Sequence, residues 1–361
     1  MVVNMDIENK TEFLGMDIEA LEKYLVSLGQ PRFRASQVYT WIYRKEINSF
    51  YEMTDIPKKL RVSLDEMAVV SIPRVLKQRV SRDNTRKFLL EMKDKKKVET
   101  VVIPQSWDNN TRYSLCISTQ VGCPVGCSFC ATGLSGFQRN LMAYEMAGQV
   151  LGSRRELSKR LKVKDEQLIT NVVYMGMGEP LLNFDEMLKS IHILNDHKGI
   201  NIGQRHITVS TAGEVQGIEK LAQEDLQVTL AISLHACNNE LRDQLIPLNR
   251  KYPLEELMKS VAAYIHHTNR RVTFEYIMLD EVNTSITDAQ GLIKLVKPLL
   301  ANVNLIPYNE VSGLEFKRPP SAKIRQFFNW LVDGGLNVNL REERGSDIEA
   351  ACGQLAAKRE R

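Results

Sequence analysis

Residues 115–134 read LCISTQVGCPVGCSFCATGL and contain four of the six cysteines of the chain. Three of these, Cys123, Cys127 and Cys130, are separated by three and two intervening residues, so their thiolates can bind one soft metal centre from a single loop. Gly122 and Gly126 allow the backbone to turn tightly around such a centre. No fourth cysteine has partner spacing. The open coordination position favours a reactive iron-sulfur cluster over a structural zinc site, which is the alternative.

The rest of the chain has an ordinary globular composition. Its 361 residues are 43% hydrophobic and 25% charged, which excludes disordered, collagen-like and low-complexity proteins. No apolar run approaches the ~20 residues that cross a bilayer, and residues 1–13 lack the layout of a signal peptide. Clustered cysteines in such a chain indicate metal or thiol chemistry and not a disulfide scaffold. We therefore expect a cytoplasmic enzyme or binding protein with one large and one small unit.

The net charge of +4 is unevenly distributed along the chain. Residues 1–30 carry a net charge of −4, residues 31–97 a net charge of +9, and residues 98–361 a net charge of −1. A basic segment beside a nearly neutral one suggests a polyanionic partner. A solvated charged surface explains the charge alone equally well.

The first 97 residues are expected to form a small, basic, mostly helical accessory domain. Apolar spacing predicts helices over residues 17–28, over residues 35–45 and after Pro57. A hairpin is expected next, with strands over residues 86–92 and 98–103 joined by a lysine-rich tip. The domain boundary then falls at residue 97.

From residue 115 onward, short β-rich runs alternate with amphipathic helices. The alternation predicts parallel strands with right-handed crossovers, in an α/β fold whose main domain spans residues 98–345 and ends in a tail over residues 346–361. The predicted strands cover residues 115–121, 171–175, 206–211, 228–234, 272–278, 303–308 and 337–340. The predicted helices include residues 184–194, 254–266, 286–299 and 322–331.

Polar and sulfur residues gather at the carboxyl ends of these predicted strands. Because they come from nearly every strand, a full or partial barrel is favoured over an open, doubly wound sheet, in which a ligand sits at one switch point. The cysteine loop follows the first strand. The residues that end or follow later strands are Gly178, Glu179, Ser210, Ser233, His235 and Asn309.

The cysteine loop, with an aromatic residue before its last cysteine, resembles the radical S-adenosylmethionine (SAM) superfamily. Longer motifs, which stretch from residue 98 to residue 361, are similar to the RlmN/Cfr family of RNA methyltransferases. The N-terminal part is similar too, in having a basic helical accessory domain before the barrel. The resemblance implies a partial (β/α)6 radical SAM barrel, a 4Fe-4S cluster on Cys123, Cys127 and Cys130, and SAM on its unique iron. The motifs are residues 116–123, 175–183 (MGMGEPLLN), 233–235 (SLH) and 347–355 (DIEAACGQL).

The same resemblance assigns roles to three further residues. Cys352 matches the family's methyl carrier, which takes a methyl group from one SAM, while a second SAM supplies the radical that links the carrier to a ring carbon of adenine. A thiol suits this role because a thiolate is a strong nucleophile. Glu99 matches the proposed acceptor of the ring proton, and Cys116 matches the cysteine that releases the product as a Cys116–Cys352 disulfide. Taken alone, Cys116 reads as a small buried residue and Glu99 as an exposed glutamate.

The resemblance also implies SAM contacts at the strand ends. A glycine allows close approach of the backbone and a carboxylate pairs with an ammonium group, which are the roles implied for Gly178 and Glu179. His235 taken alone reads as a hydrogen-bonded histidine at a strand end, and Cys237 reads as a packing residue. The implied SAM-binding residues are Gly178, Glu179, Ser210, Ser233, Leu234, His235 and Asn309.

Within the family, Pro180 after Glu179 favours the branch that methylates carbon 2 of an adenosine in the peptidyl-transferase region of 23S rRNA and, in some bacteria, the adenosine after the tRNA anticodon. A Cfr-type carbon 8 enzyme and, more remotely, a radical SAM activase are the alternatives. A non-catalytic RNA-binding protein has no use for the cysteine loop. The resemblance implies a cytoplasmic monomer with 23S rRNA, tRNA and a flavodoxin or ferredoxin with its reductase as partners. Residues 31–97 would grip RNA phosphates.

Overall fold

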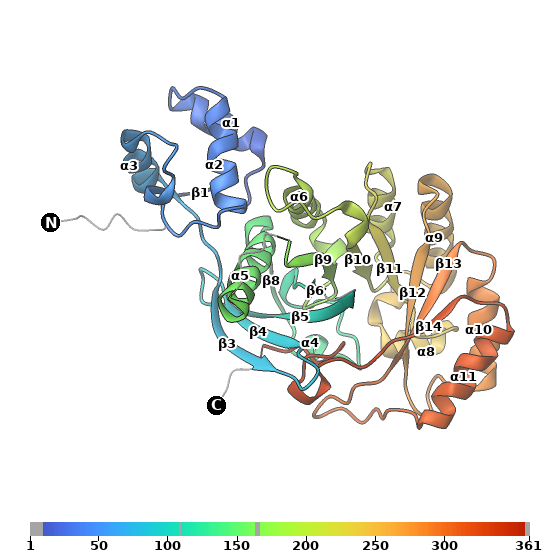
Figure 1. Ribbon diagram of the computed structural model, residues 1–361. Helices are drawn as coiled ribbons and strands as arrows, with labels where there is room; N and C mark the ends of the chain where they lie inside the picture. Colours follow the sequence, from blue (N-terminus) through green and yellow to red (C-terminus); the bar gives the residue numbers. More distant parts are fainter. Residues whose placement is uncertain (1–9, 108–109, 163–166, 358–361) are drawn as a thin grey trace.

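One ten-stranded sheet organises most of the chain (Figure 1). The computed structural model describes residues 10–107, 110–162 and 167–357. Within these residues, no helix combines the length and the apolar character that crossing a membrane requires.

Seven strands of this sheet run parallel to one another. Their order across the sheet is β6 (Asn110–Cys116), β9 (Ile169–Tyr174), β10 (Ile207–Thr211), β11 (Thr229–Ser233), β12 (Val272–Met278), β13 (Ala301–Pro307) and β14 (Val338–Leu340). The helices between them are α5 (Ala143–Leu161), α6 (Phe184–Asn195), α7 (Val215–Gln223), α8 (Asn239–Leu245), α9 (Leu254–Thr268), α10 (Ile286–Val296) and α11 (Ser321–Asp333). Among the described strands the sheet order ends openly at β14, so the barrel is partial and the predicted fold class is confirmed.

The parallel strands form because their sequences are apolar on both faces. Of the seven residues of β12, six are buried, and the central residues of β11 are buried as well. Burial on both faces is typical of strands that lie between helices and a barrel interior. The predicted strands and helices between residues 171 and 340 are confirmed to within a few residues.

The prediction of a single strand over residues 115–121 is wrong, because β6 ends at Cys116. The chain bends there, and Ile117 and Thr119 donate their backbone N–H groups to the carbonyls of Val173 and Met177 at 3.0 and 2.8 Å. A separate strand, β7 (Gln120–Gly122), then pairs antiparallel with β8 (Phe137–Asn140) outside the main sheet. The bend directs the cysteine loop over the carboxyl ends of the parallel strands.

Three antiparallel strands extend the sheet beyond β6: β5 (Lys97–Trp107), β4 (Arg86–Glu91) and β3 (Arg74–Val80). The predicted hairpin is therefore present as β4 and β5, and β3 is an additional strand. Since β4 pairs with β5 and β5 pairs with β6, the boundary expected at residue 97 falls inside a continuous sheet. The charge distribution that placed this boundary carries no information about strand pairing.

The N-terminal helical unit precedes β3 in the chain and packs on α5. The three predicted helices are present as α1 (Ile18–Ser27), α2 (Phe33–Tyr43) and α3 (Lys58–Met67), and the short strands β1 (Thr11–Glu12) and β2 (Ala68–Val69) pair in parallel. Asp17 begins α1 by accepting a hydrogen bond from the N–H of Ala20 at 2.7 Å. Buried Arg154 of α5 donates to the carbonyl of Tyr43 at 2.7 Å and joins the two parts.

The residues after β14 cross the molecule and return to the antiparallel strands (Figure 1). The backbone N–H of Gly345 donates to Asp83, in the β3–β4 turn, at 3.0 Å. Further along, after the turn η6 (Ser346–Ile348), the carbonyl of Gly353 accepts from the N–H of Ala131 at 2.8 Å. Ala131 begins the short helix α4 (Ala131–Leu134), directly after the cysteine loop. This course brings Cys352 beside that loop.

Candidate active site

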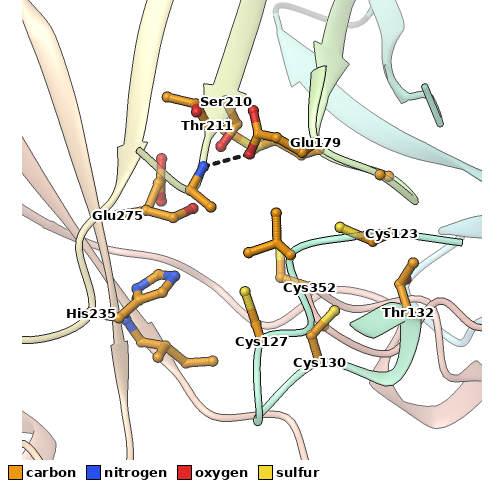
Figure 2. Close-up of a pocket in the computed structure, with 18 of the residues that line it drawn as sticks. Cys123, Cys127, Cys130, Thr132, Glu179, Ser210, Thr211, His235, Glu275 and Cys352 are labelled. Carbon is orange, nitrogen blue, oxygen red and sulfur yellow. Dashed lines mark hydrogen bonds between the residues drawn. The ribbon is translucent and has the colours of Figure 1, made fainter. Parts of the chain in front are cut away.

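The cysteine loop forms one wall of a cavity at the carboxyl ends of the parallel strands (Figure 2). Gly122, where β7 ends, has a φ of 79°, and a Cβ there would lie 1.8 Å from the carbonyl oxygen of Gly136. Cys123, Cys127 and Cys130 all line the cavity. They pack against an apolar cluster that includes Val125, Phe129, Ala212, Leu245, Ile246, Ile277, Leu279 and Tyr308.

The donor set of this loop fits an iron-sulfur cluster. Within the described residues, no three His, Cys, Asp or Glu side chains gather in the manner of ligands to a single metal ion. The three sulfurs instead point into a common space (Figure 2). Burial raises the pKa of Cys123 to about 12, and burial together with the charges of neighbouring thiolates raises the pKa of Cys127. Thiolates in such an apolar setting require a cationic centre, and three thiol donors suit a 4Fe-4S cluster.

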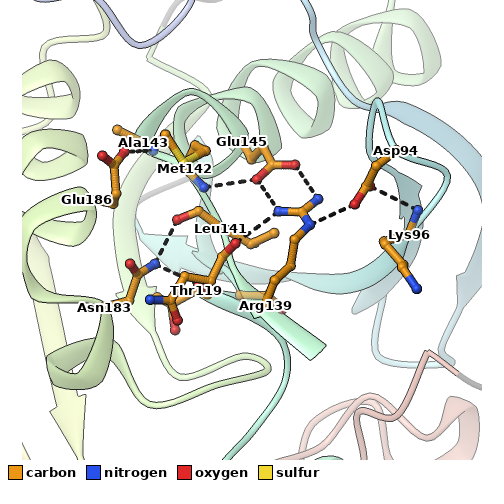
Figure 3. Close-up of polar contacts among 12 residues, drawn as sticks. Asp94, Lys96, Thr119, Arg139, Leu141, Met142, Ala143, Glu145, Asn183 and Glu186 are labelled. Atoms are coloured by element: carbon orange, nitrogen blue, oxygen red, sulfur yellow. Dashed lines mark hydrogen bonds and ion pairs between the residues drawn. The ribbon is translucent and has the colours of Figure 1, made fainter. Parts of the chain in front are cut away.

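A polar network fixes the strand that returns from the loop (Figure 3). Arg139 of β8 donates to both carboxylate oxygens of Glu145, at the start of α5, at 2.7 and 2.8 Å. It also pairs with Asp94, in the β4–β5 turn, at 2.7 Å. The amide of Asn183 donates to backbone carbonyls on both sides of the loop at 2.9 and 2.7 Å. The loop is thereby anchored by charge-assisted hydrogen bonds of Arg139 to α5 and the β4–β5 turn, and by the neutral hydrogen bonds of Asn183.

Glu179 lies across the cavity from the cysteine loop and is buried. Its two carboxylate oxygens accept hydrogen bonds from the N–H groups of Leu181 at 3.0 Å and Ala212 at 2.6 Å. Burial outweighs these bonds and raises the pKa of Glu179 to about 7. An ammonium group would offset this burial, which agrees with the expected contact to the SAM amino group. Gly178 beside it has a φ of 105°, a conformation that favours glycine.

His235 follows β11 and faces the cavity (Figure 2). Its Nδ1 accepts a hydrogen bond from the N–H of Ile277 at 3.0 Å, so the ring proton is on Nε2. Burial and the nearby charge of Arg242 lower the pKa of His235 to about 3, which keeps the ring neutral. Its ring meets that of Phe129 edge-on at 4.9 Å between centroids. His235 is thus a hydrogen-bonded strand-end histidine and also part of the cavity wall.

The other expected SAM contacts differ in position. Leu234, the first residue after β11, does not line the cavity, because its side chain is fully buried in the hydrophobic core. Asn309 lies in a neighbouring hollow, where its side-chain oxygen is buried without a hydrogen-bond partner among the described residues. The expected contacts that line the cavity are Gly178, Glu179, Ser210, Ser233 and His235.

Cys352 lines the same cavity, so the C-terminal segment adds a fourth thiol to the three of the loop (Figure 2). Cys116, at the end of β6, is buried close by. Burial, and then the charge of a Cys352 thiolate, raise the pKa of Cys116 to about 12. Both thiols are free in this structure. The two cysteines that the family resemblance pairs are therefore brought near each other from distant parts of the chain.

Glu99 is buried, in contrast to the exposed glutamate that its neighbouring lysines suggest. One carboxylate oxygen lies 3.1 Å from the Nζ of Lys87, and the other accepts the N–H of Ala356 at 2.9 Å. The sequence neighbours mislead here because β5 directs Glu99 inward, toward the segment that carries Cys352.

Comparison with known proteins identifies the family. Residues 11–70 match the family model of the ribosomal RNA large subunit methyltransferase N-terminal domain, and residues 117–289 match that of the radical SAM superfamily. The chain is 66% identical over 351 residues to the probable dual-specificity RNA methyltransferase RlmN of Syntrophomonas wolfei, which covers 97% of this chain and 98% of that protein. This chain belongs to the RlmN family.

Other matches agree with this placement in the RlmN family. The dual-specificity RNA methyltransferase RlmN of Alcanivorax borkumensis is 44% identical over 98% of this chain and 92% of its own length. The crystal structure of a radical SAM methyltransferase from Sphaerobacter thermophilus superposes with a TM-score of 0.90 at 41% identity, and covers 96% of this chain and 100% of that one. Membership of the radical SAM superfamily implies a 4Fe-4S cluster and SAM.

Three residues at this RlmN-family site belong to no motif in the sequence. Arg242 is fully buried and donates to the carbonyls of Ala212 and Ser233 at 2.7 and 3.1 Å, which joins the ends of β10 and β11. Glu275 and Arg341 line the cavity. A glutamate inside the apolar run 272–278 is a sequence signal for Glu275, whereas Arg242 lies in an ordinary polar helix and gives none.

Cys237, expected to be a packing residue, does not line the cavity. Its Sγ lies 3.8 Å from a carboxylate oxygen of Asp288 and packs against Gly291, where a Cβ would come within 2.6 Å of the sulfur. It is the cysteine of choice for a control substitution in this RlmN-family chain.

Proposed function

We propose that this chain methylates carbon 2 of an adenosine in the peptidyl-transferase region of 23S rRNA, and also the adenosine 3′ of the tRNA anticodon, through a methylated Cys352. The observation that carries the proposal is the position of four thiols around one cavity, three from the cysteine loop and one from the C-terminal segment. The high identity to a protein named as a dual-specificity RNA methyltransferase supports both kinds of RNA. A radical SAM activase has no need of Cys352, Cys116 or a basic accessory unit.

Cys352 acts first as a nucleophile in the proposed reaction. Its thiolate attacks the methyl group of one SAM, so that an S–CH3 bond forms, the sulfonium bond breaks and S-adenosylhomocysteine leaves. Cys123, Cys127 and Cys130 would hold a 4Fe-4S cluster, which would supply the electron that cleaves a second SAM to methionine and a deoxyadenosyl radical. That radical takes a hydrogen atom from methyl-Cys352, and the methylene radical on Cys352 then adds to carbon 2 of the adenine. Two SAM molecules are therefore used in each turnover.

Glu99 and Cys116 complete the proposed turnover. The adduct radical gives up one electron, which a cluster held by Cys123, Cys127 and Cys130 would take back, so that the electron used in SAM cleavage is recovered. Glu99 takes the proton from carbon 2, and the Cys116 thiolate attacks the sulfur of Cys352. The bond from that sulfur to the new methyl carbon breaks, and the carbon takes up a proton. The resulting Cys116–Cys352 disulfide is reduced by an external thiol before the next turnover.

The basic residues 31–97 are proposed to bind the RNA. Phe33 and Tyr51 of the helical unit are 59% and 50% exposed, and the guanidinium of Arg34 lies 4.8 Å from the centre of the Phe33 ring. Cationic groups bind phosphates, and exposed rings stack on unpaired bases. A target adenine inside folded RNA is extruded into the barrel mouth. The proposal includes a monomeric, cytoplasmic enzyme that receives electrons from a flavodoxin or ferredoxin with its reductase.

A reconstituted assay tests this proposal. The full-length protein is loaded anaerobically with iron and sulfide, supplied with SAM and a reductant, and incubated with 23S rRNA or tRNA from a strain that lacks the modification. We expect about four irons per chain and 2-methyladenosine in both RNAs by mass spectrometry of nucleosides. The matched pair Cys127→Ala and Cys237→Ala separates cluster loss from general thiol damage, since only the first should lose iron and methylation.

Each alternative gives a different result in this assay. Formation of 8-methyladenosine would assign the chain to the Cfr type and overturn the carbon 2 proposal that rests on Pro180. Product in rRNA alone would remove tRNA from the proposed substrates. Failure to assemble the cluster, in protein that is otherwise folded, would overturn the radical mechanism.

A further inference from the structure

Lys87 and Glu99 form an ion pair inside the antiparallel part of the sheet. Lys87 lies on β4 and Glu99 on β5, where β4 residue Leu89 is the direct partner of Glu99, so Lys87 is its diagonal neighbour on the same face. The side chains are 7% and 10% exposed, and the Lys87 Nζ lies 3.1 Å from a carboxylate oxygen of Glu99. Buried charges of this kind are retained only where further hydrogen bonds satisfy them.

Those further hydrogen bonds go to the C-terminal segment, on both sides of Cys352. The Nζ of Lys87 donates to the carbonyl of Glu349 at 2.8 Å, three residues before Cys352. The second carboxylate oxygen of Glu99 accepts the N–H of Ala356 at 2.9 Å, four residues after Cys352. One ion pair on the sheet therefore holds both ends of the stretch that presents the thiol to the cavity.

The segment depends on such contacts because it has little apolar side-chain volume of its own. Between Gly345 and Ala357 the buried apolar side chains are those of Ile348, Ala350, Ala351 and Leu355, two of which are single methyl groups. Glycine at 345 and 353 adds none. Backbone hydrogen bonds to charged side chains are stronger than those to neutral ones, so Lys87 and Glu99 are well suited to dock this backbone.

We infer that Lys87 is a positioning residue: with Glu99 it forms a clasp that fixes the Cys352 segment against the cavity. The inference deepens the proposed function and rests on it, since it concerns the proposed carrier thiol and the proposed base. Removal of the Lys87 ammonium takes a donor from Glu349 and leaves the Glu99 carboxylate buried without its counter-charge.

The clasp also links proton transfer to movement of the segment. When it is closed, both oxygens of Glu99 are engaged, one by Lys87 and the other by Ala356. A proton arriving from the substrate neutralises the carboxylate, which ends the ion pair and weakens the bond to the Ala356 N–H. The residue that receives the proton is thus the one that loosens the segment holding Cys352, at the stage at which Cys116 attacks its sulfur.

Hydrogen–deuterium exchange of the reconstituted full-length protein, without RNA or SAM, tests the clasp. In Lys87→Met we expect backbone amides of residues 349–356 to exchange at least about tenfold faster than in the wild type, because opening the clasp exposes them. Lys96→Met, the same substitution at an exposed position of the β4–β5 turn, should leave this exchange unchanged. Equal exchange in Lys87→Met and the wild type would overturn the inference.

A double variant keeps the test decisive if Lys87→Met does not fold. Lys87→Met combined with Glu99→Gln leaves no buried charge unpaired while still removing the ammonium donor, and it should also show fast exchange at residues 349–356. Slow exchange in this folded double variant would equally overturn the inference. Because exchange is measured without turnover, absence of RNA methylation by the wild type would overturn the proposed function and leave the clasp result standing.

Discussion

Two segments bring thiols to the same cavity, but they are held there by different forces. The cysteine loop, residues 122–130, packs its three cysteines against an apolar cluster, and β7 and β8 pair beside it. The carrier segment, residues 345–357, is attached mainly by polar contacts of its backbone. Asp83 and Glu99 accept two of its N–H groups, and Lys87 and the N–H of Ala131 donate to two of its carbonyls. The loop is held mainly by apolar packing, whereas the carrier segment combines a few apolar contacts, of Ile348, Ala350 and Leu355, with hydrogen bonds of its backbone.

This difference agrees with the different roles of the two segments in the proposed reaction. The ligands of a cluster hold one centre throughout turnover, so their positions should not change. Burial of apolar surface stabilises such a fixed arrangement by roughly 25 cal/mol per Å² removed from water. The carrier thiol instead meets a SAM methyl group, an adenine and Cys116 in succession. Hydrogen bonds exchange with water at a net cost of only about 1 kcal/mol each, so a segment held by them can detach and return. The polar attachment is therefore suited to a moving part.

Cys352→Ala is the sharpest way to separate the two segments, and it has the largest expected effect. Without the thiol no methyl group can be carried, so RNA methylation should fall below detection. The cysteine loop is untouched, so the variant should still bind iron and still cleave SAM reductively to deoxyadenosine. The two products are measured in one incubation, by mass spectrometry of nucleosides and by chromatography of the SAM products.

Cys237→Ala provides the control for this variant, since Cys237 is a free cysteine outside the cavity. It should retain both activities. Loss of SAM cleavage together with methylation in Cys352→Ala would show that the two segments do not act separately, and would contradict the carrier role. Methylation that persists in Cys352→Ala would contradict it outright.

Arg139→Met removes a contact that anchors the cysteine loop, and it should lower the free energy of unfolding. It leaves the Glu145 carboxylate, whose side chain is 2% exposed, without its guanidinium partner. Breaking a buried pair in this way costs about 3 kcal/mol, measured as the free energy of unfolding of the cluster-free chain in urea. Hydrogen–deuterium exchange of the amides of residues 349–356 should stay at the wild-type rate, since the contacts that hold the carrier segment do not involve Arg139.

The companion variant Arg139→Met with Glu145→Gln should recover part of the lost stability, because no buried charge is then unpaired. If the free energy of unfolding of Arg139→Met lies within about 0.5 kcal/mol of the wild-type value, the Arg139–Glu145 pair contributes no more than an ordinary surface contact. Rapid exchange of the carrier segment in this variant would remove the distinction between the two segments.

The sequence predicts the position of the cysteine loop far better than that of the carrier segment. The spacing of Cys123, Cys127 and Cys130 is local, and period and turn signals are local too, so the loop, the parallel strands and α1 to α3 can be read from neighbouring residues. The strand-end rule also brings Ser210 and Ser233 to the cavity correctly, since parallel strands present their carboxyl ends on one side.

The remaining features depend on contacts between residues that are far apart in the chain. In the sequence, Lys87 and Glu99 are ordinary residues of a lysine-rich hairpin. Their contacts with the C-terminal segment are visible only in the structure. The boundary at residue 97 follows charge and misses strand pairing. Leu234 is included with Ser233 and His235 by motif, yet its side chain is buried in the hydrophobic core. Arg242 becomes recognisable only when the ends of β10 and β11 are seen together.

Asp83→Asn tests the polar attachment with the smallest expected effect. Burial alone would raise the pKa of Asp83, but hydrogen bonds with Thr85, Ser81 and Gly345 outweigh it and hold the pKa below its usual value of about 3.9. A lowered pKa in the folded chain contributes stability that is fully present above the usual pKa and is lost as the pH falls through the folded value. The melting temperature of the wild type should therefore exceed that of Asp83→Asn by a constant margin above about pH 5, and the margin should shrink below about pH 4. A margin that is the same from pH 3 to pH 7 would mean that the charge of Asp83 does not contribute, and that shape complementarity and not electrostatics holds the carrier segment to the β3–β4 turn.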